Sequence, residues 1–268
     1  MEGKITTIID NCVYGHILQA EHGLSVYIEK NGYKYLFDTG SSDLFLHNAR
    51  VLHIDLTEVD YLILSHGHGD HAGGLRAFMR QNQKAKIIVN KGFFDRKFKG
   101  DRENGVRHPD ELDRSRFLTF DTTTLLHEGI YICPVIHIFN PADTHFSQFV
   151  VERGGTRIPD DFIDEQALVI REGNDLTLLS ACSHRGITNI IRSIMPQFEG
   201  YHLRQVVGGF HIHMAGEEQC NLIAQFFQQY PECRIGVCHC SGVDQFARLY
   251  SLLGDRVFYN HIGTTLSV

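Results

Sequence analysis

The sequence of 268 residues lacks any long apolar run and any excess of basic residues. No segment approaches the roughly 18 consecutive apolar residues that a membrane-spanning helix needs, so we expect no membrane association. Asp and Glu number 32 against 25 Lys and Arg, which gives a formal net charge of −7. Because non-specific binding of nucleic acid depends on basic patches, we expect no nucleic-acid partner.

The chain also lacks an internal repeat, a low-complexity tract and a recognisable export signal. Its first five residues show no basic segment followed by an apolar stretch, the pattern typical of a signal peptide. It contains seven cysteines, and an odd number without an export signal predicts reduced thiols in the cytoplasm. With 43% apolar and 21% charged residues, it has the composition of an ordinary globular protein, which excludes collagen-like, coiled-coil and disordered chains.

Histidine is the residue type present in excess. The chain has 17 histidines, against four methionines and no tryptophan. Since histidine is the commonest metal ligand among side chains, the places where imidazoles gather are the first candidates for a functional site.

The predicted elements change along the chain from antiparallel strands to alternating strands and helices. Residues 24–29 and 33–37 flank an Asn-Gly pair, which is a strong hairpin signal. Later strands at 205–208, 234–238 and 257–259 alternate with helices at about 186–198, 217–230 and 243–253. Two packed sheets with helices on the outside account for the antiparallel first part of the chain and for the alternating second part. We therefore predict an α/β (α+β) four-layer αββα sandwich of two mixed sheets. We expect residues 1–268 to form one domain, with a variable insertion or lid at about 91–164.

Four potential metal ligands lie within six residues, directly after a predicted buried strand at 60–65: His66, His68, Asp70 and His71. Alternate residues of an extended segment face one side, so His66 and His68 are predicted to point the same way. The glycines between them permit the turns that bring Asp70 and His71 around. Imidazole nitrogens and a carboxylate suit zinc, iron or manganese. A polar surface loop is the alternative, but it does not explain three histidines and an aspartate at these offsets.

The segment 66–71, His-Gly-His-Gly-Asp-His, resembles the H-x-H-x-D-H signature of the metallo-β-lactamase-fold superfamily. Asp38-Thr39-Gly40, at the end of an early predicted strand, resembles the Asp-Thr-Gly element that precedes this signature. The resemblance implies the αββα sandwich and a pair of bound metal ions. It also implies hydrolysis of an ester, amide, thioester or phosphodiester, with redox or transfer chemistry in some members.

Further segments narrow the resemblance to one subgroup, named for a 7,8-dihydropterin-6-methyl-4-(β-D-ribofuranosyl)-aminobenzene-5'-phosphate synthase. They are Pro159-Asp160-Asp161-Phe162, Glu165-Gln166-Ala167-Leu168, Cys182-Ser183-His184-Arg185-Gly186-Ile187, Gly208-Gly209-Phe210-His211 and His239-Cys240-Ser241-Gly242. This resemblance covers nearly the whole chain and is weakest at about 93–149. Since bacterial-type members are described only as metal-dependent hydrolases, the subgroup name is a poor guide to the substrate.

Three histidines at later strand ends, His184, His211 and His239, are expected to converge on the first cluster. The superfamily's Gly-His-Thr-type third histidine is missing before the strand at 167, so His184 is the expected ligand beside His66 and His68. Cys182 stands in the place of the bridging aspartate, so either its thiolate or water alone bridges the ions. His239 is then the last ligand, with Asp70 and His71. Asp38 is expected to fix the tautomer of a ligand histidine.

These residues predict a binuclear metal-dependent hydrolase. Two divalent ions about 3.5–4 Å apart would share a hydroxide that attacks the substrate. Zinc is the expected metal, with iron or manganese as alternatives. Asp70 is the predicted proton acceptor as well as a ligand.

The expected partner is a small molecule, anionic or phosphorylated in one interpretation, with Arg185 and His211 as the substrate-binding residues. Residues 91–116 hold eight Lys and Arg and six acids, which favours a solvated mixed-charge surface over an anion-recruiting lid. Two other functions stay open. One is a synthase or transferase acting on a pterin and a phosphoribosyl-aminobenzene. The other is a metal- or redox-sensing module that depends on Cys182, Cys238 and Cys240.

Overall fold

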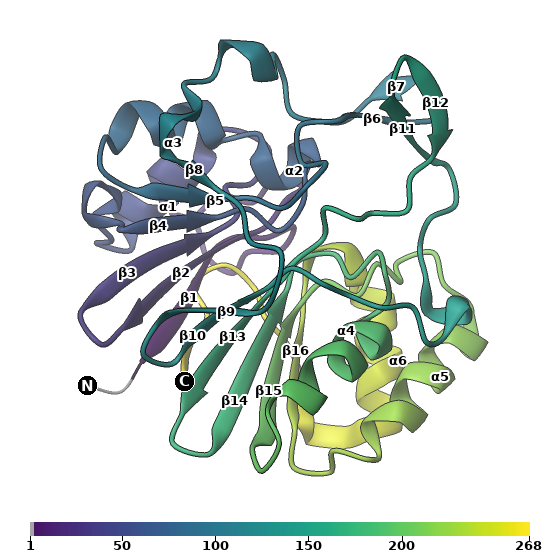
Figure 1. The fold of residues 1–268 in the computed structure, drawn as a ribbon. Coiled ribbons are helices and arrows are strands. Elements are labelled where there is room, and N and C mark those ends of the chain that lie inside the picture. Colours follow the sequence, from purple (N-terminus) through teal and green to yellow (C-terminus); the bar gives the residue numbers. More distant parts are fainter. Residues whose placement is uncertain (1–2) are drawn as a thin grey trace. The chain divides into compact units, whose positions relative to one another are not determined.

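The computed structural model describes residues 3–268, which divide into two compact units (Figure 1). The first unit contains residues 3–121, 146–164 and 261–267, and the second contains 122–145 and 165–260. Each unit has its own seven-stranded sheet of mixed strand direction and its own helices. The predicted α/β class with two mixed sheets is therefore confirmed, whereas the single domain with one insertion stays a prediction.

The large sheet of the first unit has the strand order β18-β1-β2-β3-β4-β5-β8. Its strands are β1 (Lys4–Ile9), β2 (Ser25–Lys30), β3 (Tyr33–Phe37), β4 (Tyr61–Ile63), β5 (Lys86–Ile88), β8 (Phe117–Leu118) and β18 (Thr265–Ser267). The predicted β2–β3 hairpin is present, and Asn31 and Gly32 in its turn have positive φ angles of 51° and 84°, as a tight hairpin turn requires.

Strands β3, β4, β5 and β8 run parallel, so the chain must cross back between them. The connections from β3 to β4 and from β4 to β5 contain α1 (Leu44–Val51), the short η1 (Leu56–Glu58), α2 (Gly69–Ala72) and α3 (Leu75–Gln81). Fully buried side chains of Leu62, Phe45 and Phe78 form part of the core under them. Asp38 and Ser65 follow the carboxyl ends of β3 and β4, where the apolar core gives way to polar residues.

The first unit also contains a small antiparallel sheet of order β12-β11-β6-β7, drawn at the upper right of Figure 1. Its strands are β6 (Arg96–Lys99), β7 (Arg102–Glu103), β11 (Phe149–Arg153) and β12 (Thr156–Pro159), and two short turns, η2 (Pro109–Glu111) and η3 (Arg114–Arg116), follow β7. Segment 91–164, in which we expected an insertion or lid, thus supplies this sheet as well as strands of both large sheets.

The sheet of the second unit has the order β17-β16-β15-β14-β13-β10-β9. Its strands are β9 (Thr124–His127), β10 (Ile130–Cys133), β13 (Ala167–Glu172), β14 (Asp175–Ser180), β15 (His202–Gly208), β16 (Arg234–Val237) and β17 (Val257–Tyr259). Its helical segments are η4 (Pro141–Asp143), α4 (Ile187–Ile194), η5 (Met195–Gln197), α5 (Glu217–Phe227), η6 (His239–Ser241), α6 (Val243–Leu253) and η7 (Gly254–Arg256).

Strands β14 to β17 are parallel, with α4, α5 and α6 in the connections between them. Figure 1 shows these three helices gathered beside β15 and β16. Buried Ile190, Val206 and Ile235 belong to the core that joins helices and sheet. Among the helices of residues 3–268, none combines the length and the apolar character needed to cross a membrane.

Candidate metal centre

The first group of predicted ligands lies in the first unit, with His66 and His68 in the turn between β4 and α2 and Asp70 and His71 in the first turn of α2. The centroid of the His66 ring is 4.7 Å from that of His68 and 4.4 Å from that of His71. All three histidines are buried, and Oδ2 of Asp70 lies 3.6 Å from Nε2 of His71. The fold of this unit therefore brings all four candidate ligands of segment 66–71 together.

Asp38 and Ser65 fix the tautomers of two of these histidines. Oδ2 of Asp38 lies 2.8 Å from Nδ1 of His71 and also accepts a hydrogen bond from the Ser65 hydroxyl. Because a carboxylate only accepts, Nδ1 of His71 carries the proton, and its lone pair is at Nε2. The Ser65 hydroxyl, whose proton points to Asp38, accepts from Nδ1 of His66 at 2.9 Å. Both rings thus present Nε2 as the ligand atom. The sequence predicted this role for Asp38 and missed Ser65.

Burial favours the neutral form of His66 and His68. Loss of hydration lowers the pKa of His66 well below its usual value of about 6.5. The same effect lowers the pKa of His68 to about 3. Neutral imidazole is the form that binds a metal ion, so the site is prepared for ligation at neutral pH.

The second unit contains the second group of candidate ligands, Cys182, His184, His211 and His239. Cys182, His184 and His211 offer ligand atoms within 4.8 Å of one another, and so do Cys182 and His239. The His184 and His211 ring centroids lie 4.2 Å apart. Cys182 and His184 follow β14, His211 follows β15 and His239 follows β16. Since these strands are parallel, their carboxyl ends meet at one edge of the sheet, which explains how residues distant in sequence become neighbours.

Glu165 and His145 shape the turn that presents His184. The Glu165 carboxylate accepts hydrogen bonds from the backbone N–H of His184 (2.6 Å) and of Arg185 (2.8 Å). The backbone N–H of His145 donates to the carbonyl oxygen of His184, and the His145 carbonyl oxygen lies 3.3 Å from Nδ1 of His184. Neither residue was predicted from the sequence to have a role, although Glu165 lies in one of the segments that resemble the family.

Several site residues have a left-handed backbone. Asp38, Ser183, His211 and His239 have φ angles of 62°, 57°, 52° and 49°. This conformation is uncommon for residues other than glycine, and strained residues of this kind cluster at functional sites. Its recurrence after β3, β14, β15 and β16 therefore supports a functional role for these strand ends.

Other residues singled out in the sequence have different surroundings. Nε of Arg185 donates to the carbonyl oxygen of Ile136 at 3.0 Å. The backbone N–H of His211 donates to Sγ of Cys240 at 3.3 Å. None of the seven cysteines forms a disulfide bond. Lys97 corrects an expectation: although it lies in the segment predicted as a solvated surface, its side chain is fully buried, because Asp160 and Asp164 pair with it there.

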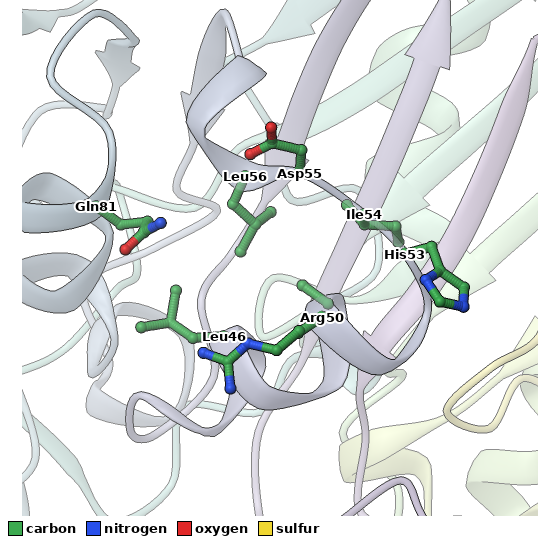
Figure 2. A pocket seen from close by; sticks show the side chains of 8 residues that line it. Leu46, Arg50, His53, Ile54, Asp55, Leu56 and Gln81 are labelled. Atoms are coloured by element: carbon green, nitrogen blue, oxygen red, sulfur yellow. The ribbon is translucent and has the colours of Figure 1, made fainter.

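A separate groove in the first unit carries no part of the candidate site. It has a volume of about 390 Å³ and is lined by Leu46, Ala49, Arg50, His53, Ile54, Asp55, Leu56 and Gln81. Figure 2 shows its labelled side chains, which come from α1, from the turn after it and from the end of α3. None of the predicted ligands or substrate-binding residues is among them.

The donor atoms of both groups fit a divalent transition metal. Imidazole nitrogen, carboxylate oxygen and thiolate sulfur are the ligands of zinc and iron, and a calcium site would instead be built from oxygen. In the first group, hydrogen bonds to Nδ1 direct the imidazole Nε2 atoms of His66 and His71 towards that role.

Comparison with known proteins identifies the family. The model of the metallo-beta-lactamase superfamily matches residues 18–182, which is more than half of the chain. This chain belongs to the metallo-β-lactamase superfamily. The resemblance inferred from segment 66–71 is therefore confirmed.

A solved structure supports the assignment over the whole length. The crystal structure of Tm1679, a metal-dependent hydrolase of the β-lactamase superfamily, is 30% identical, covers 99% of each chain and has a TM-score of 0.82. The metallo-β-lactamase fold protein YhfI from Bacillus subtilis is 14% identical with a TM-score of 0.60 over the full length of both chains, and this similarity shows the fold alone. The metallo-β-lactamase fold is thus established for this chain.

Two relatives come from Methanocaldococcus jannaschii. An uncharacterized protein, MJ0448, is 28% identical over 269 residues, covering 98% of this chain and all of the relative. A 7,8-dihydropterin-6-methyl-4-(β-D-ribofuranosyl)-aminobenzene-5'-phosphate synthase is 26% identical over 260 residues, covering 89% of this chain and 87% of the relative. The similarity to the synthase agrees with the subgroup resemblance found in the sequence.

Proposed function

We propose that this protein is a binuclear metal-dependent hydrolase that acts on a small anionic substrate in the cytoplasm. The observation that carries the proposal is the hydrogen-bonded chain from Asp38 through Ser65 to His66 and from Asp38 to His71. This arrangement orients Nε2 of two buried histidines, His66 and His71, as metal ligands. Membership in the superfamily supports the same interpretation. The odd number of cysteines, seven, supports a reducing compartment.

The proposed ligand sets combine residues of both groups. His66, His68 and His184 would hold one ion, and Asp70, His71, His239 and Cys182 would hold the other. Zinc suits this mixture of imidazole, carboxylate and thiolate better than a hard cation does. Two observations support these sets. The donor atoms in each group suit a transition metal, and each group lies after the carboxyl ends of parallel strands of its own sheet.

The ions would supply Lewis acidity, which makes water a better nucleophile near neutral pH and stabilises negative charge that develops on the substrate. The residues of the chain have their own tasks. Asp38 and Ser65 keep the imidazoles in the ligating tautomer. Asp70, partly accessible to solvent with 22% of its side chain exposed, would accept the proton released in the reaction. His211, beside His184, and Arg185 would contact the substrate.

Metal analysis combined with a substrate screen tests the proposal. Freshly purified protein should contain about two equivalents of zinc, iron or manganese and should hydrolyse a member of a panel of phosphate and carboxylic esters. His68→Ala should abolish turnover and lower the metal content while the far-ultraviolet circular dichroism is unchanged. Protein that binds no divalent ion, or a His68→Ala variant as active as the original, would contradict the proposal.

The similarity to the pterin-linked synthase favours a second candidate function, condensation of a dihydropterin with a phosphoribosyl-aminobenzene. The same metal-loaded protein can be assayed for this condensation beside the ester panel. Condensation without ester hydrolysis would favour the synthase. Hydrolysis without condensation would favour the hydrolase.

A further inference from the structure

We infer that the buried cluster of Lys97, Asp160 and Asp164 is a positioning element for the metal-binding turn, which it holds through Gly67. This inference rests on the proposed function, because it assigns to these residues an effect on metal affinity. None of the three was a candidate site residue in the sequence. Lys97 was expected on a solvated surface.

The cluster is a charge triad without access to solvent. Nζ of Lys97 lies 3.0 Å from Oδ2 of Asp160 and 2.9 Å from Oδ1 of Asp164, and the side chains of all three residues are fully buried. Removing charges from water is expensive, and a buried ion pair often stabilises a fold no better than apolar residues of the same size. The two carboxylates also outnumber the one ammonium group. Stability alone is therefore a poor explanation for this triad.

The triad reaches the proposed metal-binding turn, residues 66–71, by a hydrogen bond to Gly67. Oδ2 of Asp164 accepts from the backbone N–H of Gly67 at 2.7 Å. Gly67 lies between His66 and His68 in the chain, so this bond fixes the peptide that joins two proposed ligands. The Oδ1 atom of the same carboxylate binds Lys97. One oxygen of Asp164 thus binds the Lys97 ammonium group, and the other binds the backbone of Gly67.

Phe162 links the triad to the imidazoles themselves. Its backbone N–H donates to Oδ1 of Asp160 at 2.8 Å. Its ring centroid lies 5.3 Å from that of His68 and 6.4 Å from that of His66. Nζ of Lys97 lies 5.6 Å from the same ring centroid. The Phe162 ring, whose backbone is bound by Asp160, therefore lies beside the rings of both His66 and His68.

The small sheet holds the triad and the turn together. Lys97 lies in β6, opposite Val151 of β11. The backbone carbonyl oxygen of Asn104, just after β7, accepts a hydrogen bond from the backbone N–H of Gly69 at 2.7 Å. The next residue, Gly105, forms an isolated antiparallel β-bridge with His68. Two amides of the turn, those of Gly67 and Gly69, are thus bound to this region of the first unit. The sheet acts as a support for the turn that carries His66 and His68.

The size of the effect follows from the place of the triad directly behind the proposed ligands. Interactions behind metal ligands contribute about 10- to 100-fold to metal affinity in other sites. We expect a loss of this size when Asp164 loses its charge.

The test compares Asp164→Asn, Lys97→Met and Asp161→Asn by equilibrium competition with a chelator for Zn²⁺. Asp164→Asn keeps an oxygen that can accept from Gly67 but loses the charge. Asp161 is the control, because it lies in the same segment, is exposed and pairs with Arg153. Absorption spectra of the Co²⁺-loaded proteins report the ligand geometry, which a purely structural role would leave unchanged. If Asp164→Asn does not fold, the triple variant Lys97→Met/Asp160→Asn/Asp164→Asn, which removes all three buried charges, takes its place.

We expect Asp164→Asn and Lys97→Met to bind Zn²⁺ about 10- to 100-fold more weakly and to show altered Co²⁺ spectra, while Asp161→Asn matches the original protein. Folded variants with unchanged affinity and spectra would overturn the inference and leave the proposed function intact. Failure of the original protein itself to bind Zn²⁺ or Co²⁺ would instead refute the proposed function.

Discussion

Nδ1 of His71 lies 2.8 Å from Oδ2 of Asp38, and neither side chain is accessible to solvent. Oδ1 of the same carboxylate accepts from the backbone N–H of Ser65 at 2.7 Å. Asp38 therefore joins the end of β3 to the start of segment 66–71, which carries the candidate ligands, and fixes the proton of His71 on Nδ1.

Asp38→Asn should weaken metal binding about 10- to 100-fold, because an amide nitrogen facing His71 can stabilise the wrong tautomer. Chelator competition with Zn²⁺ measures the change. Asp43→Asn, at an exposed position in the same unit, is the control and should bind as the original does. Equal affinity of the two variants would show that Asp38 does not orient the ligand.

The local elements and the first ligand group were predictable from the sequence, because both depend on neighbouring residues. The β2–β3 hairpin follows from its Asn-Gly turn, and the proximity of His66, His68, Asp70 and His71 follows from their spacing after β4. Their supports were not predictable. Lys97 and Asp164 lie 67 positions apart, and a lysine in a segment of mixed charge gives no sign that it is buried.

Glu165→Gln tests the support of the second group. The Glu165 carboxylate accepts from the N–H groups of both His184 and Arg185, and a glutamine would offer only one oxygen to two donors. We expect the ion bound through His184 to be held about tenfold more weakly, with little change in the other ion. Metal content after stepwise dialysis against a chelator measures this. Glu172→Gln, at the exposed end of β13, should behave like the original protein.

The stability of the metal-free protein should fall as the solution becomes more acidic. The pKa of His68 is about 3 in the folded state and about 6.5 in an unfolded chain. Between these values the unfolded state binds more protons than the folded state does. The free energy of unfolding therefore falls as the pH is lowered through this window, and His68 causes no further change below it. From about pH 7.5 to 5.5 the loss from His68 alone is about 1 kcal/mol, and burial of His66 acts in the same direction.

Urea unfolding in the presence of a chelator at the two pH values measures this loss. His68→Gln should reduce the difference between them by about 1 kcal/mol. His202→Gln, an exposed substitution in β15, is the control. A difference of the same size in the original protein and in His68→Gln would show that His68 is not the group responsible.

The two glycines of the metal-binding turn should differ in their tolerance of a methyl group. A Cβ at Gly67 would lie 2.1 Å from the backbone carbonyl oxygen of Phe93, whereas a Cβ at Gly69 would lie 3.4 Å from its nearest neighbour, the carbonyl oxygen of Asn104. The backbone of Phe93 cannot move aside as a flexible side chain could. Gly67→Ala must therefore displace the turn and the ligands on either side of it.

We expect Gly67→Ala to lower the free energy of unfolding by about 3 kcal/mol and to weaken Zn²⁺ binding, because His66 and His68 shift with the peptide between them. Gly69→Ala should bind Zn²⁺ normally and unfold at nearly the original urea concentration, because its methyl group makes an ordinary contact and alanine favours the helix that starts there. Urea unfolding and chelator competition on the matched pair measure both effects. Equal behaviour of the two variants would mean that the close approach of Phe93 does not fix the position of the turn.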